Sequence, residues 1–317
     1  VEPNTLHEIT IRCFQRRFLL KPSRRVRELV LGVLGRAQRH TGIVIHEFVF
    51  LSNHAHLDVS PRDATQLAKF MGFLSGNVSA EIGTRLHRWP GSMFDRRYTS
   101  IRVYDSEADQ VGRIRYCLAH GCKENLVLSP RHWPGARGLP AILNGRYELE
   151  GTWVNRTDLR EAQDRARRLK HRGVKKVRQR DFLEVERVRL TPFPCWSHLG
   201  KSEYRRRFLE IVREVEDDAR RRHREGAAFL GVKGVVSQNP HASPEAPNRS
   251  PRPRYHARCR QARRRLYEAE LAFVDAYRRA AQRLRLGEHG LRFPEGAFPP
   301  SSPFVKNRTG LPPPAVA

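Results

Sequence analysis

The chain has 317 residues, of which 60 are lysine or arginine and 33 are aspartate or glutamate, so its formal charge is +27. Such an excess of positive charge attracts polyanions, and we expect a nucleic-acid partner, although charge alone does not separate DNA from RNA. We expect no membrane partner and a cytoplasmic protein, because no apolar run is long enough to cross a bilayer, no signal peptide is recognisable, and the five cysteines are scattered.

Hydrophobic spacing in the first 120 residues alternates between the periods of helices and strands. Val26, Leu29, Val30, Val33 and Leu34 recur at helical spacing, whereas the stretch after the next glycine is rich in β-branched and aromatic residues. The predicted elements are, in chain order, a strand over 7–14, a helix over 24–40, strands over 43–50 and 54–59, a helix over 65–86, a strand over 98–103 and a helix over 106–119. This order predicts an α+β fold, an antiparallel sheet with helices on one face.

The strand predicted over 54–59 carries the most informative residues of the chain. Because side chains alternate along a strand, His54, His56 and Asp58 share one face, while the apolar residues between them face the other. Two imidazoles at this spacing can reach the same divalent ion. Short histidine pairs are also common in surface turns, so the motif gains weight from its surroundings.

Four segments resemble, in order and spacing, the motifs of one protein family. They are residues 7–12 (HEITIR), 51–57 (LSNHAHL), 93–100 (MFDRRYTS) and 115–118 (RYCL). Over about residues 5–135 the sequence resembles the HUH-type single-tyrosine transposases, most closely their REP-associated tyrosine transposase branch. The resemblance implies a ferredoxin-like or RRM-like antiparallel sheet, Mg²⁺ or Mn²⁺ as cofactor, and single-stranded or hairpin DNA as partner. It also implies cleavage and rejoining of single-stranded DNA through a 5′-phosphotyrosine, either by a monomer or by a homodimer.

Tyr116 is the candidate nucleophile, since it lies on the helix that the family places beside the metal. A phenol attacks phosphorus effectively when its proton is removed and the phosphate charge is neutralised. The alternative is that Tyr116 only packs its ring against the core, as half-buried tyrosines often do. Tyr98, at the start of a strand in an arginine-rich turn, is interpreted as a packing or base-stacking residue.

A metal held by His54 and His56 needs a third protein ligand, and two residues are candidates. His120 follows Tyr116 by four positions, so both lie on one helix face, and related enzymes use a side chain at this offset. Here the segment 119–122 (AHGC) stands where the family has L-N-P-V. Asp58 is the rival from the strand face, where a carboxylate would suit Mg²⁺ or Mn²⁺.

Several arginines lie near the expected DNA path, and each can form a bidentate contact with a phosphate. The candidate DNA-binding residues are Arg12, Arg16, Arg17, Arg96 and Arg97. Two nearby aromatic residues, Phe14 and Trp89, are able to stack on unpaired bases, with core packing as the alternative.

The composition changes near residue 151, so we divide the chain into four parts. Residues 1–150 form the expected transposase catalytic domain, and 151–190 a basic arm or linker lying along phosphate. Residues 191–290 form a basic α-helical accessory region that adds DNA affinity, and 291–317 a proline-rich disordered tail. The sequence predicts a nucleoid-associated, metal-dependent DNA transposase. The alternative is a catalytically inactive, domesticated DNA- or RNA-binding protein with the same fold.

Overall fold

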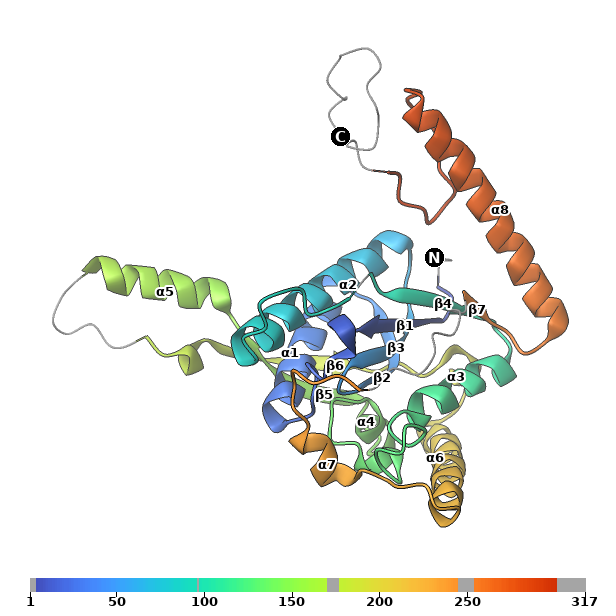
Figure 1. Ribbon diagram of the computed structural model, residues 1–317. Coiled ribbons are helices and arrows are strands. Elements are labelled where there is room, and N and C mark those ends of the chain that lie inside the picture. The colour runs from blue at the N-terminus through green and yellow to red at the C-terminus, as the bar shows by residue number, and fades with distance from the viewer. Residues whose placement is uncertain (1–3, 96, 170–176, 245–253, 301–317) are drawn as a thin grey trace.

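A five-stranded sheet forms the centre of the molecule (Figure 1), and the computed structural model describes residues 4–95, 97–169, 177–244 and 254–300. Its strands, in spatial order, are β2 (Val44–Phe50), β3 (His54–Ser60), β1 (His7–Arg12), β4 (Thr99–Val103) and β7 (Tyr255–His256). The first four pair antiparallel, and β7 joins the β4 edge in parallel. The predicted α+β class, element order and antiparallel sheet are confirmed.

Two helices, α1 (Arg24–Thr41) and α2 (Ala64–Val78), pack beside each other on one face of the sheet. Ser23 and Asp63 begin them by accepting hydrogen bonds from backbone N–H groups of the first turn, as N-cap residues do. The apolar residues of β1 and β3 face this layer, and Ile11 lines a hollow together with side chains of α2. The predicted second helix continues past α2 as a π-helical stretch, Ser79–Leu86.

The third helix, α3 (Glu107–Ala119), covers the opposite face of the sheet, so the expectation of helices on one face is corrected. The alternate residues of β1 and β3 on that face are polar, and they find partners on α3. Arg113 of α3 forms an ion pair with Glu8 of β1, and Tyr116 lies against His56 of β3. Polar groups buried on this face need such partners, which an apolar helix would not supply.

A two-stranded ribbon, β5 (Glu148–Val154) and β6 (Leu183–Arg189), packs across α1 on the side away from the sheet. The ribbon approaches so closely that a β-carbon at Gly32 would lie 2.0 Å from the backbone oxygen of Thr152. Helix α5 (Arg156–Leu169) extends from the ribbon and projects from the body (Figure 1). Most of these elements fall in the segment 151–190 that was interpreted as a basic arm, although β5 begins before it, at Glu148. Residues 170–176 lie outside the described residues.

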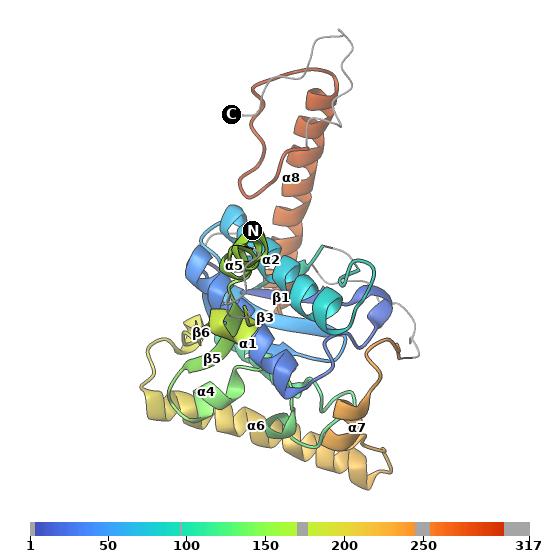
Figure 2. The same cartoon turned by 90° about the vertical axis from the view of Figure 1, so that its left-hand side faces the viewer.

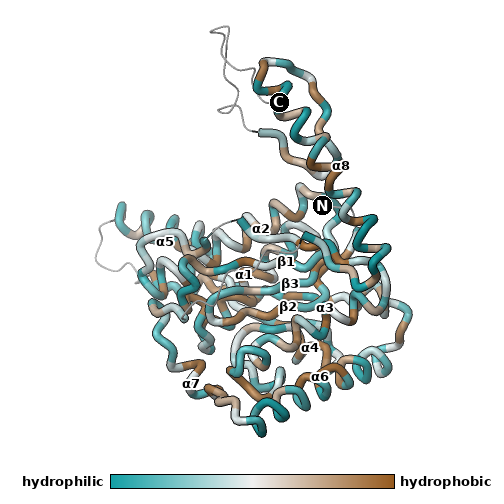
Figure 3. The backbone as a smooth tube through the Cα atoms, turned by 45° about the vertical axis from the view of Figure 1, so that its right-hand side comes forward, coloured by the Kyte–Doolittle hydropathy of each residue, from teal (hydrophilic) through white to brown (hydrophobic). Residues whose placement is uncertain are grey.

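The remaining helices are α4 (Leu139–Leu143), α6 (Lys201–Arg224), α7 (Gly231–Ser237) and α8 (Arg260–Arg285). Helix α6 runs along the base of the molecule beneath α4 (Figure 2) and packs against α3. Helix α8 follows β7 and projects from the body; like α5 it is largely hydrophilic, whereas the brown, hydrophobic segments gather in the central strands (Figure 3). None of the described helices is long and apolar enough to cross a membrane. Residues 301–317 of the predicted disordered tail lie outside the described part.

Candidate functional site

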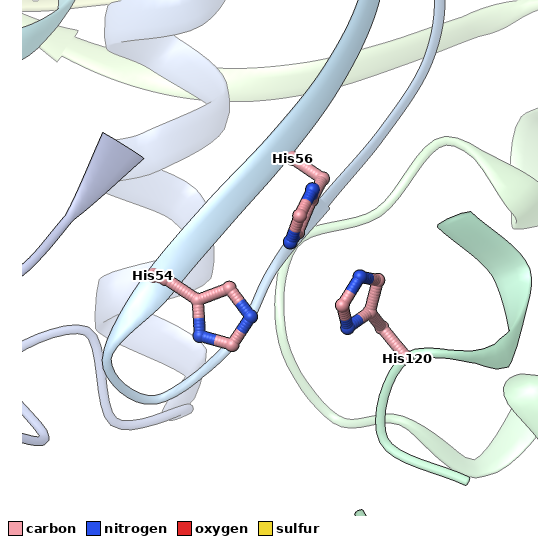
Figure 4. Close-up of side chains that lie close together, drawn as sticks. All are labelled: His54, His56 and His120. Carbon is pink, nitrogen blue, oxygen red and sulfur yellow. The ribbon is translucent and has the colours of Figure 1, made fainter. Parts of the chain in front are cut away.

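Three histidines converge between β3 and the end of α3 (Figure 4). His54 and His56 point from the strand β3, and His120 is the residue that directly follows α3. The ring centroids of His56 and His120 are 4.0 Å apart, and those of His54 and His120 are 5.4 Å apart. One nitrogen from each ring lies within 4.8 Å of the others, which brings three donors around a space where one metal ion would fit.

Each of the three histidines has its Nδ1 atom next to an oxygen. The distances are 2.6 Å from His54 to the Asn53 amide oxygen, 2.8 Å from His56 to Glu8, and 3.0 Å from His120 to Glu124. Since the ionised carboxylate of Glu8 only accepts hydrogen bonds, Nδ1 of His56 carries the proton and donates it. At His120 the Lys123 ammonium, which only donates, lies 3.2 Å from Nε2, so Nδ1 carries the proton there too. The Nε2 lone pairs are then available for a metal, and the carboxylate partners orient the rings as in known metal sites.

Burial tunes the protonation of these groups toward metal binding. Desolvation lowers the pKa of His56 despite the bond to Glu8, and it holds the pKa values of His54 and His120 well below the ordinary value. Burial alone would raise the pKa of Glu8, but the hydrogen bond from His56 and the charge of Arg113 bring it below its ordinary value. The site therefore combines neutral imidazoles with an ionised carboxylate at neutral pH.

Asp58, the rival third ligand, lies deeper on the same face of β3 and is not a member of the histidine group. It is 1% exposed, and the side chain of Cys117 on α3 is its hydrogen-bonding neighbour. Burial and the nearby charge of Glu8 raise its pKa well above the ordinary value. A carboxyl group must lose its proton to bind a metal, so the deeper position of Asp58 and its raised pKa both favour His120 as the third ligand.

Tyr116 is half-buried on α3, with its ring centroid 5.6 Å from that of His56 and 4.8 Å from that of His120. Two cations lie over its ring: the guanidinium carbon of Arg113 at 4.3 Å and the Lys123 ammonium at 3.5 Å from the centroid. Burial and the charge of Glu8 raise the pKa of Tyr116, while the charge of Arg113 lowers it. The Tyr116 hydroxyl group is therefore protonated in the free protein at neutral pH.

A hollow beside Tyr116 contains two of the five arginines that were expected to bind DNA. Arg12 and Arg97 line it together with His56 and Tyr116. Arg16 and Arg17 follow β1 on a turn, where Arg17 approaches Gln15 and the backbone of His241. Arg96 lies outside the described residues.

The turn after α3 fixes the direction of the His120 side chain. Helix α3 ends at Ala119, and Gly121 adopts a positive φ of 87°, which favours glycine. Glu124 bonds both sides of this turn, accepting from the Gly121 N–H at 2.6 Å and from His120. Arg222 of α6 bonds the carbonyl oxygen of Cys122 and supports the turn from behind. His120 is therefore the C-cap residue of α3. The spacing alone had placed it on the helix face, which is corrected here.

Sequence reasoning did not identify Glu8, Glu124, Arg113 or Lys123. The spacing of four residues between His120 and Glu124 was a usable signal, since residues at that offset often contact each other. Glu8 carried a weaker signal, because only the pairing of β1 with β3 reveals that it lies beside His56. Nothing in the sequence distinguished Arg113 and Lys123, the two cations over Tyr116, from the many other basic residues of the chain.

Part of the chain is similar to known transposases. Residues 4–115 match the family model described as IS200-like transposase, which confirms the predicted resemblance for this part of the chain. A REP-associated tyrosine transposase, solved bound to a REP hairpin, is similar over 42% of this chain and 76% of its own, with 14% identity and a TM-score of 0.35. A protein from Deinococcus radiodurans described as a candidate transposase is similar over 36% of this chain and 89% of its own, with 12% identity and a TM-score of 0.28. No curated protein matches.

Proposed function

We propose, from the premise that residues 4–115 form an IS200-like transposase domain, that this protein cleaves and rejoins single-stranded DNA. The observation that carries the proposal is the convergence of three buried histidines beside a half-buried tyrosine. This arrangement combines a site for a divalent ion with a nucleophile at its edge. Hairpin DNA of the REP type is the substrate class that we propose.

Tyr116 acts as the nucleophile in this proposal. Its Oη atom attacks the scissile phosphorus, the phenol gives up its proton, and the bond from phosphorus to the 3′ oxygen breaks. The 3′ oxygen takes up a proton and leaves as a hydroxyl group, while the 5′ end stays on Tyr116 as a phosphotyrosine. The 3′-hydroxyl group of another strand reverses the step and rejoins the DNA. The phosphodiester energy is retained, so no nucleotide cofactor is required.

The histidines would hold the metal through their Nε2 atoms, with His120 as the third ligand. A divalent ion bound there would neutralise the phosphate charge and polarise the phosphorus. Three imidazoles suit Mn²⁺ better than Mg²⁺, which prefers oxygen ligands. Since Lys123 lies 3.2 Å from Nε2 of His120, a metal ion would replace this contact. The expected outcome is that Mn²⁺ supports activity at a lower concentration than Mg²⁺ does.

Basic side chains around the site would bind the DNA backbone. Arg12 and Arg97 line the hollow beside Tyr116 and are suited to the phosphates next to the cleavage position. The helices of the second half, with the projecting α5 and α8, add affinity for the hairpin in this proposal. Action on genomic hairpins would place the protein in the cytoplasm at the nucleoid. A homodimer is compatible with the proposal and is not required by it.

The proposal is tested with end-labelled DNA hairpins that carry single-stranded extensions, incubated with the protein and Mn²⁺. A labelled band of protein size on a denaturing gel is the expected result, absent with EDTA and absent in Tyr116→Phe. An inactive binding protein would instead bind the hairpin tightly and give no adduct. If single-stranded RNA displaced the hairpin at equal concentration and no adduct formed, the RNA-binding alternative would replace the proposal.

A further inference from the structure

An aromatic and cationic cluster lies outside the histidine site, on the turns that follow β1 and the π-helical stretch. Its centre is Trp89, whose ring is stacked with that of His241 at a centroid distance of 5.9 Å and an interplanar angle of 30°. The guanidinium carbon of Arg17 lies 5.0 Å from the centroid of the Trp89 ring, and the ring of Phe14 lies 6.3 Å away. Trp89 is only partly buried: it packs against the edge of the hydrophobic core and leaves part of its surface exposed.

The cluster is joined to the candidate site by short backbone connections. Arg12, the last residue of β1, pairs with His54, and the next residue, Cys13, donates its N–H to the Asn53 carbonyl. Phe14 then donates to the carbonyl oxygen of Met93, on the segment that leads from Trp89 to the hollow beside Tyr116. A DNA strand that passes the histidines along these arginine-bearing turns would therefore reach Trp89.

The turn between them is held in an unusual conformation. Gln15 and Arg16 are consecutive non-glycine residues with positive φ angles of 51° and 58°, and Arg88 has a φ of 52°. Such angles are disfavoured for residues with a side chain and are found at binding sites more often than elsewhere. Here they set the turns that carry Phe14 and Arg17 on one side and Trp89 on the other.

The imidazole of His241 covers one face of the Trp89 indole, and the contacts that hold His241 in place come from its segment and not from its side chain. It is exposed, and its segment is attached by a backbone bond from the Phe18 N–H to the carbonyl oxygen of Ala242 and by a bond from the Arg17 guanidinium to the carbonyl oxygen of His241. The imidazole is a flat aromatic heterocycle that stacks on the indole at an angle of 30°, so it covers the face on which a nucleobase would stack. A base that takes its place would also meet the guanidinium of Arg17, which stacks well on aromatic faces.

We propose that Trp89 is a stacking platform for one unpaired base of the substrate DNA, close to the cleavage position, and that His241 covers this platform in the free protein. The inference rests on the proposed function for the identity of the nucleic acid. Base stacking on an aromatic side chain contributes about 1–3 kcal/mol per base and tolerates any sequence. The platform therefore serves to hold a single strand in place and does not read its sequence.

The test compares two hairpins, one with a four-nucleotide single-stranded extension and one with a blunt end, in a fluorescence anisotropy titration. Trp89→Ala is expected to weaken binding of the extended hairpin by roughly 5- to 150-fold, the range that loss of one stacked base gives. Binding of the blunt hairpin is expected to change by less than a factor of about two, within ordinary measurement scatter for a residue that does not touch it. Trp89→Phe, which keeps an aromatic face, should retain most of the affinity, and His241→Ala should bind the extended hairpin at least as tightly as the native protein.

A second arm separates stacking from a structural role. Replacing the bases of the extension by abasic sites should weaken binding to the native protein as much as Trp89→Ala does, and should have no further effect in that variant. Equal losses on the extended, abasic and blunt hairpins, or no loss on any of them, would overturn the inference. Adduct formation by Tyr116 is scored separately. If the adduct forms but binding does not depend on the bases of the extension through Trp89, only the inference about Trp89 is wrong. If binding depends on those bases but no adduct forms, only the proposed chemistry is wrong.

Discussion

The two faces of β3 are both largely buried but chemically opposite. Leu57 is fully buried against the layer of α1 and α2, and Asp58, its neighbour, is 1% exposed on the side of α3. On the apolar face, hydrophobic contacts alone are sufficient to stabilise the buried side chains. On the second, each buried polar group requires a specific partner, so the identity and position of every neighbour matter.

The comparison shows how one strand serves both the core and the site. The apolar face anchors the strand, which holds the histidines in a fixed register with respect to Glu8 and Tyr116. The polar face is stable because Glu8, Glu124 and Arg113 satisfy groups that burial would otherwise penalise. Substitutions on the polar face should therefore impair metal binding and activity, and substitutions on the apolar face should lower stability. The following variants test this difference.

The largest effect is expected from His56→Ala on the polar face. Removing one of three ligands should weaken Mn²⁺ binding by more than about 100-fold, beyond the loss that follows removal of a supporting partner. Isothermal titration with Mn²⁺ measures this, and adduct formation should be lost with it. His132→Ala removes an exposed histidine outside the cluster and should leave both measurements unchanged. Unchanged metal binding in His56→Ala would show that the cluster is not the metal site.

Leu57→Ala tests the apolar face of the same strand. Truncation of a fully buried leucine leaves a cavity and should lower the free energy of unfolding by about 2–5 kcal/mol, measured by chemical denaturation. Under conditions in which the variant stays folded, its affinity for Mn²⁺ should match that of the native protein. A loss of metal affinity as large as that in His56→Ala would mean that the two faces are not separable.

A smaller effect is expected from Glu124→Gln, which keeps the shape of the side chain and removes its charge. Glu124 orients His120 through a 3.0 Å contact and closes the turn at Gly121. Loss of such a supporting carboxylate typically lowers metal affinity by about 10- to 100-fold, and we expect the lower end of that range. Glu214→Gln, on the exposed surface of α6, is the matched control. Equal affinities in the two variants would contradict a supporting role for Glu124.

The last prediction concerns the pH dependence of stability and Glu47, which pairs with Asp58 across β2 and β3. Complete burial raises the pKa of Glu47 to about 8, so the folded protein holds a proton that the unfolded chain, with a pKa near 4.5, releases. This group's contribution to stability is therefore complete below the unfolded value and is lost as pH rises toward 8. The melting temperature should fall by several degrees between pH 5 and pH 8.5, and Glu47→Gln should reduce that fall. An identical fall in both proteins would contradict the assignment.

Periodicity was sufficient to predict most elements of the first 120 residues. Alternation placed His54, His56 and Asp58 on one face, and the register of β1 with β3 agrees. The choice between His120 and Asp58 was beyond sequence reasoning, because it depends on depth of burial and on the turn at Gly121. Pairing of β5 with β6 was equally inaccessible, since their alternating charged residues resemble a solvated arm.

The central claim is that Tyr116 carries the DNA, and mass spectrometry of the adduct tests it most directly. After nuclease and trypsin digestion, Tyr116 falls in the peptide 116–123 and the rival Tyr98 in the peptide 98–102, each with a single tyrosine. We predict a nucleotide-bearing phosphotyrosine in the peptide 116–123, formed only in the presence of a divalent metal. Modification of Tyr98, or of any residue other than Tyr116, would contradict the account.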